Sequence, residues 1–323
     1  MSGTVQQLPP TNDREMYAAA IKSFGDAKEL RAIELPVPRI GPAEVLVRVI
    51  AAGVQLTDAA IRGGWVPPGA TIEFPQVLGN EFAGVIEAVG SEVREFAAGD
   101  EVVGFRMLGC YAEFVAVPAA QLARKPASVD WLSAGALSAS GQTAHTALER
   151  LGARQGETLL VHGAAGGVGT MLVQLARLRG LRVLGTASLA NHDYLRGLGA
   201  IPIAYGEGQT ERIRAAAGTE GIDLVLDAAG HDNLLTAVEL LANRDRIGTI
   251  VDHGLATSLG CRWITSERSA ARLGELLALC ATGDLAVTVR ATYDLEHAAD
   301  AHRDVETGHG RGKVALTIGD VTS

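Results

Sequence analysis

The sequence Glu157-Thr-Leu-Leu-Val-His-Gly-Ala-Ala-Gly-Gly-Val-Gly-Thr-Met-Leu-Val-Gln-Leu-Ala-Arg177 decides the fold of this chain. Residues 159–162 form a short apolar run typical of a β-strand, and apolar residues recur at helical spacing after the glycines. Between the two, Ala164, Gly166 and Gly169 stand at the glycine positions of the G-x-G-x-x-G fingerprint, with alanine at the first. A strand, a glycine turn and a helix in immediate succession predict a site for the pyrophosphate of a dinucleotide.

The positions of this turn have distinct physical roles in such a site. The missing side chain at Gly166 lets the backbone approach the phosphates, and that at Gly169 lets the helix pack closely on its strand. The start of the helix offers free N–H groups and the positive end of the helix dipole to an anion. The alternative interpretation is a tight strand-to-helix turn that binds no ligand. We expect a cofactor to contact Ala164, Ala165, Gly166, Gly167 and Val168.

The composition is that of a packed protein with room for two domains. The chain has 323 residues and a mass of 33.6 kDa, which is enough for two hydrophobic cores. Because 47% of the residues are hydrophobic and only 20% are charged, most of the chain is expected to be packed. A net charge of −9 and an isoelectric point near 5.4 argue against nucleic acid or an anionic membrane as a partner, since both select basic patches.

The sequence shows neither the features of a membrane-spanning or secretory segment nor the cysteine pattern of a disulfide framework. No apolar run approaches the roughly 18 residues of a membrane span, and the first residues lack a charged region followed by an apolar one. We therefore expect a cytoplasmic protein. Its three cysteines, Cys110, Cys261 and Cys280, are far apart and odd in number, which favours reduced thiols over a disulfide framework.

The pattern of strand-type and helix-type segments changes along the chain and predicts two domains. Residues 1–15 are polar and aperiodic and are expected to form a disordered tail. Residues 16–132 and 284–323 contain short β-type runs broken by glycine and proline, whereas residues 133–283 alternate between strands and helices. Such alternation indicates an α/β domain with a doubly wound parallel sheet. We expect it to be inserted into a mostly β domain built from both ends of the chain, with a ligand in the cleft between them.

The pattern of apolar residues predicts five strands and five helices in the inserted domain. The expected strands cover residues 158–162, 182–186, 201–205, 222–227 and 247–251. The expected helices cover residues 167–180, 191–198, 209–217, 231–242 and 266–281.

Six motifs along the chain resemble those of one enzyme superfamily. They are Ala51-Ala-Gly-Val54, Thr57-Asp58, Leu78-Gly79 with Glu81-Phe-Ala-Gly-Val85, Gly141-Gln-Thr-Ala144, Val161-His-Gly-Ala-Ala-Gly-Gly-Val-Gly169 and Gly308-His-Gly-Arg-Gly-Lys-Val314. Together they are similar to the medium-chain dehydrogenase/reductase superfamily, and within it to the zeta-crystallin-like quinone oxidoreductase branch. The resemblance runs from about Met16 to Gly319. It implies a GroES-like catalytic domain, a Rossmann domain, NADPH as hydride donor and, in many members, a homodimer joined through the Rossmann sheets.

Zinc ligands are missing from the positions where the alcohol dehydrogenases of this superfamily carry them. The resemblance places a cysteine ligand two residues before the Thr-Asp pair and a histidine after Gly79, and here these positions are Gln55 and Asn80. Neither side chain is the thiolate or imidazole that zinc prefers. The four-cysteine cluster of structural zinc is missing too, since no Cys-x-x-Cys pair occurs. We predict no metal site.

The predicted lack of a metal constrains the reaction. Oxidation of simple alcohols is not expected, because no Lewis acid would stabilise the alkoxide. The reaction that fits is hydride transfer from a reduced nicotinamide to an electron-poor C=C bond or a quinone, where the substrate carbonyl delocalises the developing charge. The protein then has to position the rings, donate hydrogen bonds to the enolate oxygen and exclude water. The proton would come from solvent or from one hydroxyl.

Four residues are candidates for the substrate side of the site. By resemblance, Gln55 takes the place of an asparagine that contacts the nicotinamide ribose, and Trp65 that of a tyrosine over the cofactor cleft. Thr143 lies in the Gly-x-Thr-Ala motif, whose threonine faces the nicotinamide carboxamide in relatives. The alternatives are an exposed turn for Gln55, a loop lid for Trp65 and, favoured for His145, a plain helix position. Asp58 is expected to be a structural cap rather than an acid.

The end of the second strand of the α/β domain predicts NADP(H) as the cofactor. NAD-selective folds place Asp or Glu there, where the carboxylate accepts hydrogen bonds from the ribose and repels a 2′-phosphate. Residues 182–191 contain no carboxylate, and Thr186, Ser188 and Asn191 offer hydroxyl and amide groups. Ala190 stands where close relatives often carry arginine, a strong phosphate partner, so we expect a weakened preference. The resemblance adds cofactor contacts at Tyr205, Ala228, His253, Gly254 and Lys313.

Two other functions remain open at this point. One is an NADPH-binding protein with no redox role, which a test of NADPH turnover with enones or quinones would decide. The other is an enoyl reductase in a biosynthetic pathway, which would act on an enoyl thioester or a polyketide-derived enone. A docking patch for a carrier protein would be basic, and the arginines between residues 150 and 182 keep this function open although the chain is net acidic.

Overall fold

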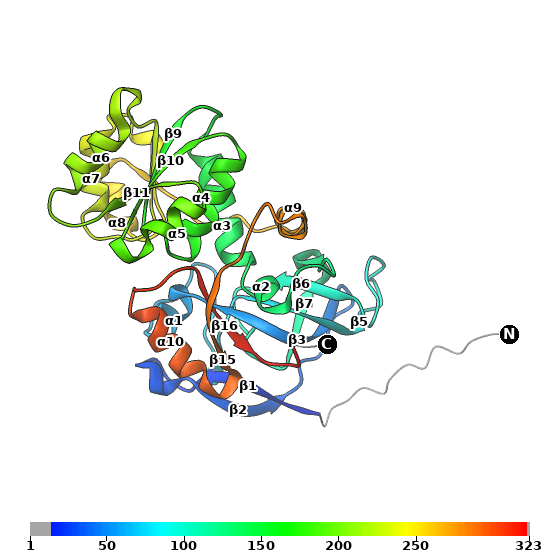
Figure 1. Cartoon of the computed structure of the whole chain (residues 1–323). Coiled ribbons are helices and arrows are strands. Elements are labelled where there is room, and N and C mark those ends of the chain that lie inside the picture. Colours follow the sequence, from blue (N-terminus) through cyan, green and yellow to red (C-terminus); the bar gives the residue numbers. More distant parts are fainter. Residues whose placement is uncertain (1–13, 322–323) are drawn as a thin grey trace.

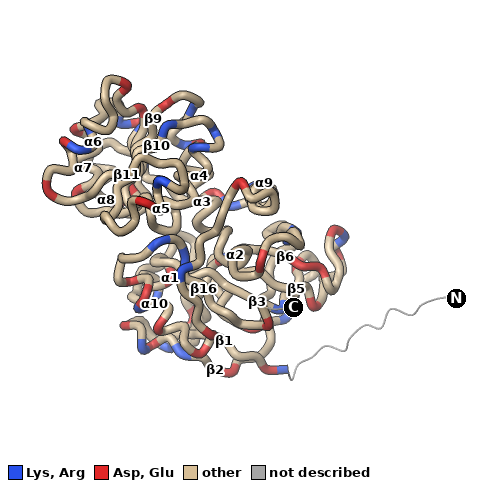
Figure 2. The backbone as a smooth tube through the Cα atoms, viewed as in Figure 1, with Lys and Arg blue, Asp and Glu red and all other residues tan. Residues whose placement is uncertain are grey.

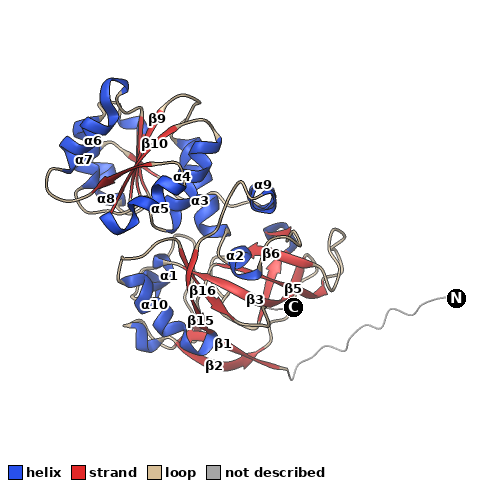
Figure 3. Cartoon of the chain, in the orientation of Figure 1, coloured by secondary structure: helices blue, strands red, loops and turns tan. Residues whose placement is uncertain are grey.

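The computed structural model describes residues 14–321, which form two lobes (Figure 1). In one lobe helices surround a central sheet, and in the other strands predominate (Figure 3). The tail expected over residues 1–15 lies outside the described residues as far as residue 13, but Glu15 already begins strand β1 (Glu15–Ile21). Between residues 14 and 321, no helix is both long and apolar enough to cross a membrane.

The α/β lobe is built on a six-stranded parallel sheet. Its strands lie in the order β11-β10-β9-β12-β13-β14, and each neighbouring pair is parallel. The chain winds from β9 outward to one edge and then from β12 outward to the other, so the strand order reverses at β9. Folds of this kind bind ligands at the carboxyl end of that strand. The strands are β9 (Thr158–His162), β10 (Arg182–Ala187), β11 (Ile201–Ala204), β12 (Leu224–Asp227), β13 (Ile247–Thr249) and β14 (Arg262–Trp263).

Helices pack around this sheet because its central strands are apolar on both faces. Every residue of β9 and β12 is buried, as expected for strands that have helices on either side. The helices of this lobe are α3 (Ser138–Arg150), α4 (Gly167–Leu178), α5 (His192–Gly197), α6 (Gln209–Ala217), α7 (Asn233–Leu240) and α8 (His253–Leu259). Helix α9 (Ala270–Thr282) instead packs against α3 and against β8 (Leu122–Arg124) of the other lobe. The doubly wound fold predicted for this part of the chain is therefore confirmed.

The region after β13 differs from the expectation. The strand expected over residues 247–251 ends at Thr249, and the chain turns into α8, which the sequence analysis missed together with β14. Asp252 caps α8 by accepting a hydrogen bond from the backbone N of Leu255 at 2.8 Å. The helix expected from residue 266 begins only at Ala270, because Ser269 caps it.

The β lobe contains a seven-stranded sheet and a three-stranded sheet. The larger has the order β15-β16-β3-β5-β6-β8, with β7 paired to β3, and the smaller has the order β2-β1-β4. Strand β16 runs antiparallel to β3, with Val314 opposite Val54, so both ends of the chain build this lobe. The strands are β2 (Arg31–Pro36), β3 (Glu44–Val54), β4 (Gln76–Val77), β5 (Glu81–Val89), β6 (Glu101–Phe105), β7 (Phe114–Pro118), β8 (Leu122–Arg124), β15 (Val289–Asp294) and β16 (Lys313–Thr317), and the helices are α1 (Leu56–Arg62), α2 (Trp131–Gly135) and α10 (Ala298–Glu306).

A continuous apolar cluster joins the two lobes. Ile50 and Val103 of the β lobe are buried in the same cluster as Leu137 and Leu148, which lie just before and within α3, and Val161 of β9. Burial of this junction fixes how the lobes sit relative to each other. On the outside, acidic and basic residues are mixed over both lobes (Figure 2).

Candidate active site

The glycine turn after β9 is shaped to leave room for a ligand. A Cβ added at Gly169 would lie 2.2 Å from the carbonyl oxygen of Gly163, so the fold itself requires glycine there. A Cβ added at Gly166 would meet only that oxygen, at 3.4 Å, and the φ of Gly166 is an ordinary −72°. Packing of the protein alone does not demand glycine at position 166, whereas a ligand that approaches the backbone does. The first N–H groups of α4, which begins at Gly167, lack helical partners and suit a pyrophosphate.

Two other residues of the turn, Ala164 and Ala165, pack into the core under the turn. Ala164 and Ala165 are buried in the apolar cluster of the α/β lobe. Their side chains therefore face inward, and only their backbone is left to meet a cofactor.

A glycine loop from the end of the chain lies against this turn. The backbone N of Gly312 donates to the carbonyl oxygen of Ala165 at 2.9 Å, and Gly312 forms a parallel bridge with Gly166. Only glycine fits at position 312, because its φ is 67° and a Cβ there would lie 2.1 Å from the carbonyl oxygen of Thr288. The β lobe thus touches the α/β lobe at the turn itself.

Lys313, which the sequence analysis expected to contact the cofactor, has its side chain buried and engaged inside the protein. Its Nζ lies 3.0 Å from Glu81 Oε1 and 3.2 Å from Ser140 Oγ, and its side chain is 1% exposed. Its stem packs beside Gly167, where an added Cβ would lie 3.0 Å from Lys313 Cδ. The structure uses Lys313 internally because the carboxylate of Glu81 is buried and needs a cation.

Glu81 is the centre of a hydrogen-bonded group drawn from four elements. Its Oε1 accepts from Lys313 Nζ and from Gln55 Nε2, and its Oε2 accepts from the backbone N of Ala139 at 2.6 Å. Gln55 immediately precedes α1, and Ala139 lies in the first turn of α3. The carboxylate also fills the space over Gly53, where a Cβ would clash with it. Glu81 therefore fixes the amide of Gln55, a predicted site residue.

A second buried group surrounds Asp58. Its Oδ2 accepts from Tyr111 Oη at 2.7 Å and from the backbone N of Gln55 at 3.0 Å, and its Oδ1 accepts from Asn80 Nδ2 at 2.9 Å. Burial raises the pKa of Asp58 to about 6, although these donors lower it. Burial, with a contribution from Asp58, also raises the pKa of Tyr111 well above its usual value. The contacts of Asp58 are those of a structural residue.

Arg268 reaches from the α/β lobe into the group around Asp58. Its Nη1 donates to the backbone oxygen and to Oδ1 of Asn80, at 2.9 and 3.2 Å, and its Nη2 lies 3.5 Å from the carbonyl oxygen of Arg106. Its guanidinium carbon lies 5.1 Å from the ring centre of Phe105. Burial lowers the pKa of Arg268. Arg268 therefore joins the lobes beside the candidate site.

Sequence reasoning missed Glu81 and Arg268 as site residues. Glu81 could have been found, because it lies in one of the motifs that carry the family resemblance. No local pattern signals Arg268, whose hydrogen-bond partner Asn80 is 188 positions away in the chain.

Thr143 and Trp65, two further substrate-side candidates, lie on or next to helices. Thr143 is half-buried on α3, and its hydroxyl donates to the carbonyl oxygen of Ala139 at 2.6 Å. Trp65 follows α1 and is 47% exposed. Both therefore remain candidates, Thr143 with an engaged hydroxyl and Trp65 as a rim residue.

His145 lies between α3 and α9. Its Nδ1 is 3.5 Å from a carboxylate oxygen of Glu149, and its Nε2 is 3.9 Å from one of Glu275. Burial first and the charge of Arg179 second lower the pKa of His145. These contacts match the plain helix position that the sequence analysis favoured, and the structure does not bring His145 to the group around Glu81.

At the end of β10, one expected phosphate donor faces inward. Thr186 is 2% exposed, and its hydroxyl accepts from the backbone N of Gly163 at 3.3 Å and lies 3.3 Å from His162 Nδ1. Contrary to the expectation of a phosphate contact, Thr186 supports the glycine turn. Ser188 and Asn191 are half-buried and linked by a 3.2 Å hydrogen bond from Asn191 Nδ2 to Ser188 Oγ, and they remain candidates.

The remaining cofactor candidates follow the strands at the same edge of the sheet. Tyr205 follows β11 and is 54% exposed, and Ala228 follows β12. His253 and Gly254 open α8 after β13, and the His253 ring lies edge-on to that of Trp263 at 5.5 Å. Since the carboxyl ends of parallel strands meet at one edge, these residues lie at the same edge of the sheet as the glycine turn.

The two positions that bind zinc in metal-dependent relatives are engaged in other contacts. Gln55 donates to Glu81, and Asn80 donates to Asp58. Within residues 14–321, no group of three or more His, Cys, Asp and Glu side chains could hold a metal ion.

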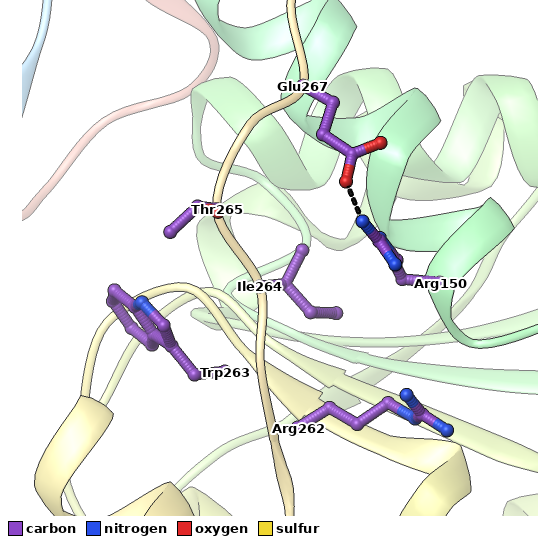
Figure 4. A pocket seen from close by; sticks show the side chains of 6 residues that line it. All are labelled: Arg150, Arg262, Trp263, Ile264, Thr265 and Glu267. Atoms are coloured by element: carbon purple, nitrogen blue, oxygen red, sulfur yellow. Dashed lines mark hydrogen bonds and ion pairs between the residues drawn. The ribbon is translucent and has the colours of Figure 1, made fainter.

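A separate hollow of about 310 Å³ lies beside the edge strand β14 (Figure 4). Arg150 and Glu267 form an ion pair in its wall. It is lined by Arg150, Arg262, Trp263, Ile264, Thr265 and Glu267, none of them a predicted site residue.

Comparison with known proteins identifies both lobes. Residues 41–127 match the alcohol dehydrogenase GroES-like domain, and residues 198–316 match the zinc-binding dehydrogenase family. The chain is 30% identical over 329 residues to a quinone oxidoreductase of Rattus norvegicus, which covers 95% of this chain and 99% of that protein. It is 34% identical over 316 residues to the pikromycin polyketide synthase component PikAII of Streptomyces venezuelae, covering 91% of this chain but spanning only 8% of that protein.

A solved structure agrees with these matches. The quinone oxidoreductase of Escherichia coli, determined in complex with NADPH, has a TM-score of 0.83 and 26% sequence identity, over 93% of this chain and 99% of that one. The fold, the motifs and the nearly full-length relative point to one family. The chain belongs to the medium-chain dehydrogenase/reductase superfamily of oxidoreductases, in its quinone oxidoreductase branch.

Proposed function

We propose that this chain is an NADPH-dependent reductase of electron-poor C=C bonds or quinones that works without a metal ion. The observation that carries the proposal is the buried group beside the glycine turn. At the two positions that bind zinc in other members of the superfamily, Gln55 and Asn80 donate hydrogen bonds to Glu81 and Asp58. An amide that donates its N–H groups to carboxylates is not a zinc ligand.

The residues present fit a phosphorylated dinucleotide. Gly166 leaves space over the turn, and α4 directs its first N–H groups toward that space. Ser188, Asn191 and Tyr205 lie at the edge of the sheet where the adenosine end belongs. NADPH, when bound, supplies the hydride. The support for this cofactor is the turn, the missing carboxylate after β10 and the relative determined with NADPH.

On the substrate side, the protein positions the acceptor and excludes water. Glu81 holds the amide of Gln55, so this predicted ribose contact is preorganised. Leu56 and Trp65, which are 60% and 47% exposed, place apolar surface at the two ends of α1. An apolar rim with few polar groups favours quinones and enones over charged substrates.

In this proposal the proton that completes the reduction comes from water. The hydroxyl of Tyr111 donates to Asp58 in the core, and that of Thr143 donates to the carbonyl oxygen of Ala139. Both hydroxyls are engaged within the protein. Protonation of an enolate by solvent needs no dedicated acid, so the chain needs only to admit water after hydride transfer.

The test is consumption of NADPH, followed by absorbance, with a panel of quinones, alkenals and enoyl thioesters. We expect turnover of at least one acceptor by the wild type and none by a folded Gly166→Val variant. Tight NADPH binding without turnover of any acceptor would favour the non-redox NADPH-binding protein instead.

The second candidate is an enoyl reductase of a biosynthetic pathway. It is motivated by the 34% identity to the polyketide synthase component PikAII over 91% of this chain. If this candidate is right, kcat/KM for enoyl thioesters exceeds that for quinones and free enones. The same panel therefore separates the two functions.

We also propose a homodimer that forms through strand β14. This strand is the edge of the six-stranded sheet and carries Trp263, which is 37% exposed. An edge strand presents unpaired backbone groups to a second copy. Light scattering coupled to gel filtration should give the mass of a dimer, and Trp263→Glu should shift it toward the monomer. A monomeric wild type would contradict the proposal.

A further inference from the structure

Arg268 lies between two parts of the candidate site. Its Nη1 donates to the backbone oxygen and to Oδ1 of Asn80, one of the two positions that bind zinc in metal-dependent relatives. The backbone N of Ser269, the next residue, donates to Gln142 Oε1 at 2.8 Å. Gln142 directly precedes Thr143, which we expect to face the nicotinamide carboxamide. The segment that carries Arg268 therefore contacts both the zinc-ligand position and the helix of the predicted nicotinamide contact.

The positive charge of Arg268 has no direct counter-charge in residues 14–321. Its side chain forms no ion pair there, and arginine stays protonated at neutral pH. The amide of Asn80 separates it from Asp58, because Asn80 donates from Nδ2 to Asp58 Oδ1 and accepts through its own Oδ1 from Arg268. Glu81 is already balanced by Lys313. A half-buried cation without a direct partner can accommodate an anionic oxygen.

The guanidinium of Arg268 also has unused hydrogen-bond donors. Of its five N–H groups, the two on Nη1 are engaged by Asn80, and Nη2 has one long contact, 3.5 Å from the carbonyl oxygen of Arg106. Nε and the second hydrogen of Nη2 have no partner among the described residues. The guanidinium carbon lies 5.1 Å from the ring centre of Phe105. Asn80 and Phe105 thus hold the group in place while two donors stay available to a ligand.

We propose that Arg268 donates a hydrogen bond to the carbonyl oxygen of the acceptor and stabilises the negative charge that hydride transfer places on this oxygen. This inference rests on the proposed function and names a catalytic residue for it. In zinc-dependent relatives the metal is the Lewis acid beside position 80. Here a guanidinium from a distant segment brings positive charge to the same position. Because Asn80 and Phe105 already hold it, Arg268 can stabilise this charge without first reorganising.

The step balances with the cofactor and water alone. The hydride and its electron pair form a new C–H bond on the β-carbon of an enone, the electrons of the C=C bond shift toward the carbonyl, and the oxygen becomes an enolate oxygen. Arg268 binds this oxygen and keeps its own proton. Water then protonates the α-carbon and leaves hydroxide to the buffer. The acceptor is reduced by two electrons and the nicotinamide is oxidised by two.

The first test is the kinetics of Arg268→Gln with an enone and with a quinone. We expect kcat with the enone to fall by roughly 100-fold to 1000-fold, as for loss of one donor to a developing oxyanion. The loss with the quinone should be smaller, because the hydroquinone anion is less basic and needs less stabilisation. Arg268→Lys should retain part of the rate, and the Kd for NADPH should not change. Arg272→Gln is the matched control, since Arg272 lies in the same segment and pairs with Glu149. It should leave both rates unchanged.

The second test needs no turnover and uses 4-nitrophenol, whose phenolate oxygen resembles an enolate oxygen. Its absorbance reports the pKa of the phenol bound to the complex with NADP⁺. A cation within a few ångströms lowers the pKa of an acid by about 1 to 3 pH units, so we expect a shift of this size with the wild type. Arg268→Gln should return the pKa of the bound phenol to its value in water.

Several results would overturn the inference. A wild type that binds the phenol without lowering its pKa would show that Arg268 does not face an anionic oxygen, whether or not the variants fold. Equal losses with enone and quinone, together with weaker NADPH binding and a lower Tm, would make Arg268 a contact that only joins the lobes. Unchanged rates of Arg268→Gln would overturn this inference alone, whereas a wild type that turns over no acceptor would overturn the proposed function.

Discussion

Lys313 Nζ lies 3.0 Å from Glu81 Oε1, and the two side chains are 1% and 0% exposed. The pair brings together β16, from the end of the chain, and β5, from its first third. Glu81 also accepts hydrogen bonds from Gln55 and from the backbone of Ala139, so the ion pair fixes the position of these candidate site residues. Each of these two buried charges needs the other, because a single buried charge without a partner destabilises the folded state.

Removal of the cation should therefore destabilise the fold strongly. Lys313→Met leaves the carboxylate of Glu81 buried and uncompensated, and we expect the free energy of unfolding to fall by about 3–5 kcal/mol. The double variant with Glu81→Gln should be less destabilised than the sum of the single changes. Denaturant unfolding of the wild type, the two single variants and the double variant measures this coupling. A loss in the double variant equal to the sum of the two single losses would contradict the prediction.

The two glycines of the turn should respond differently to the same substitution. Gly166→Val should fold and lose NADPH binding, because a Cβ there meets only the carbonyl oxygen of Gly163, at 3.4 Å, and then occupies the space of the pyrophosphate. Gly169→Val should be strongly destabilised, because its Cβ would lie 2.2 Å from the same oxygen. Thermal unfolding and fluorescence titration with NADPH separate the two effects. Near-normal affinity of Gly166→Val would place the pyrophosphate elsewhere.

Local signals predicted the parts of the molecule that depend on neighbours in sequence. The strand over residues 158–162 and the helix over residues 209–217 have the expected bounds, because an apolar run and helical spacing lie within a few residues. Helix α8 and strand β14 were missed, because seven and two residues are too few to show a period.

Long-range pairing explains what the sequence could not predict about the site. Lys313 was expected to contact the cofactor, but its partner Glu81 is 232 positions away, and a single sequence carries no sign of that pairing. Thr186 was expected to face a phosphate, yet it turns toward the glycine turn, because β10 and β9 lie side by side. The glycine turn itself could be predicted, because one short motif contains all of its residues.

His302 should make the stability of the protein depend on pH. Its Nδ1 lies 3.2 Å from Arg62 Nη1, a donor, so Nδ1 accepts and the proton of the neutral ring sits on Nε2. Burial first and Arg62 second lower the pKa of His302 to about 3. The ordinary pKa of the unfolded chain, near 6.5, is higher, so the unfolded state binds the proton more readily. Neutral His302 therefore contributes its full stability above pH 6.5, the ordinary pKa. This stability is lost as the pH falls from there toward the folded pKa of about 3.

The variant that tests this is His302→Gln, which can still accept a hydrogen bond from Arg62 but does not titrate. We expect its free energy of unfolding to fall less steeply than that of the wild type as the pH is lowered from about 7 to about 4. Denaturant unfolding at several pH values gives both slopes. Equal slopes would show that His302 does not account for the dependence.

Chelators should leave activity intact. Gln55 and Asn80 are both hydrogen-bonded to carboxylates, so the two positions offer no zinc ligand. We expect the rate with a quinone or enone to be unchanged after prolonged treatment with EDTA or phenanthroline. Metal analysis of the purified protein accompanies the assay. Stoichiometric zinc, together with a loss of rate on its removal, would refute the metal-free reductase.

The cofactor preference should favour NADPH, but only modestly. The loop after β10 contains no carboxylate to repel a 2′-phosphate, and Ser188 and Asn191 offer neutral donors to it. Ala190 supplies no charge where an arginine would form a bidentate pair with the phosphate. We therefore expect kcat/KM to favour NADPH by about one to two orders of magnitude, or roughly 1.4 to 2.8 kcal/mol.

The ratio of kcat/KM for the two cofactors with one acceptor measures this preference. Ala190→Arg should raise the ratio, because a guanidinium there adds a charge-assisted contact that only NADPH can use. Arg303→Gln is the matched control, since Arg303 is an exposed arginine of the β lobe that pairs with Asp300, and it should leave the ratio unchanged. Equal values for the wild type, or a preference for NADH, would show that Ser188 and Asn191 do not bind a 2′-phosphate. If the ratio also failed to rise in Ala190→Arg, the loop after β10 would not lie at the adenosine ribose at all.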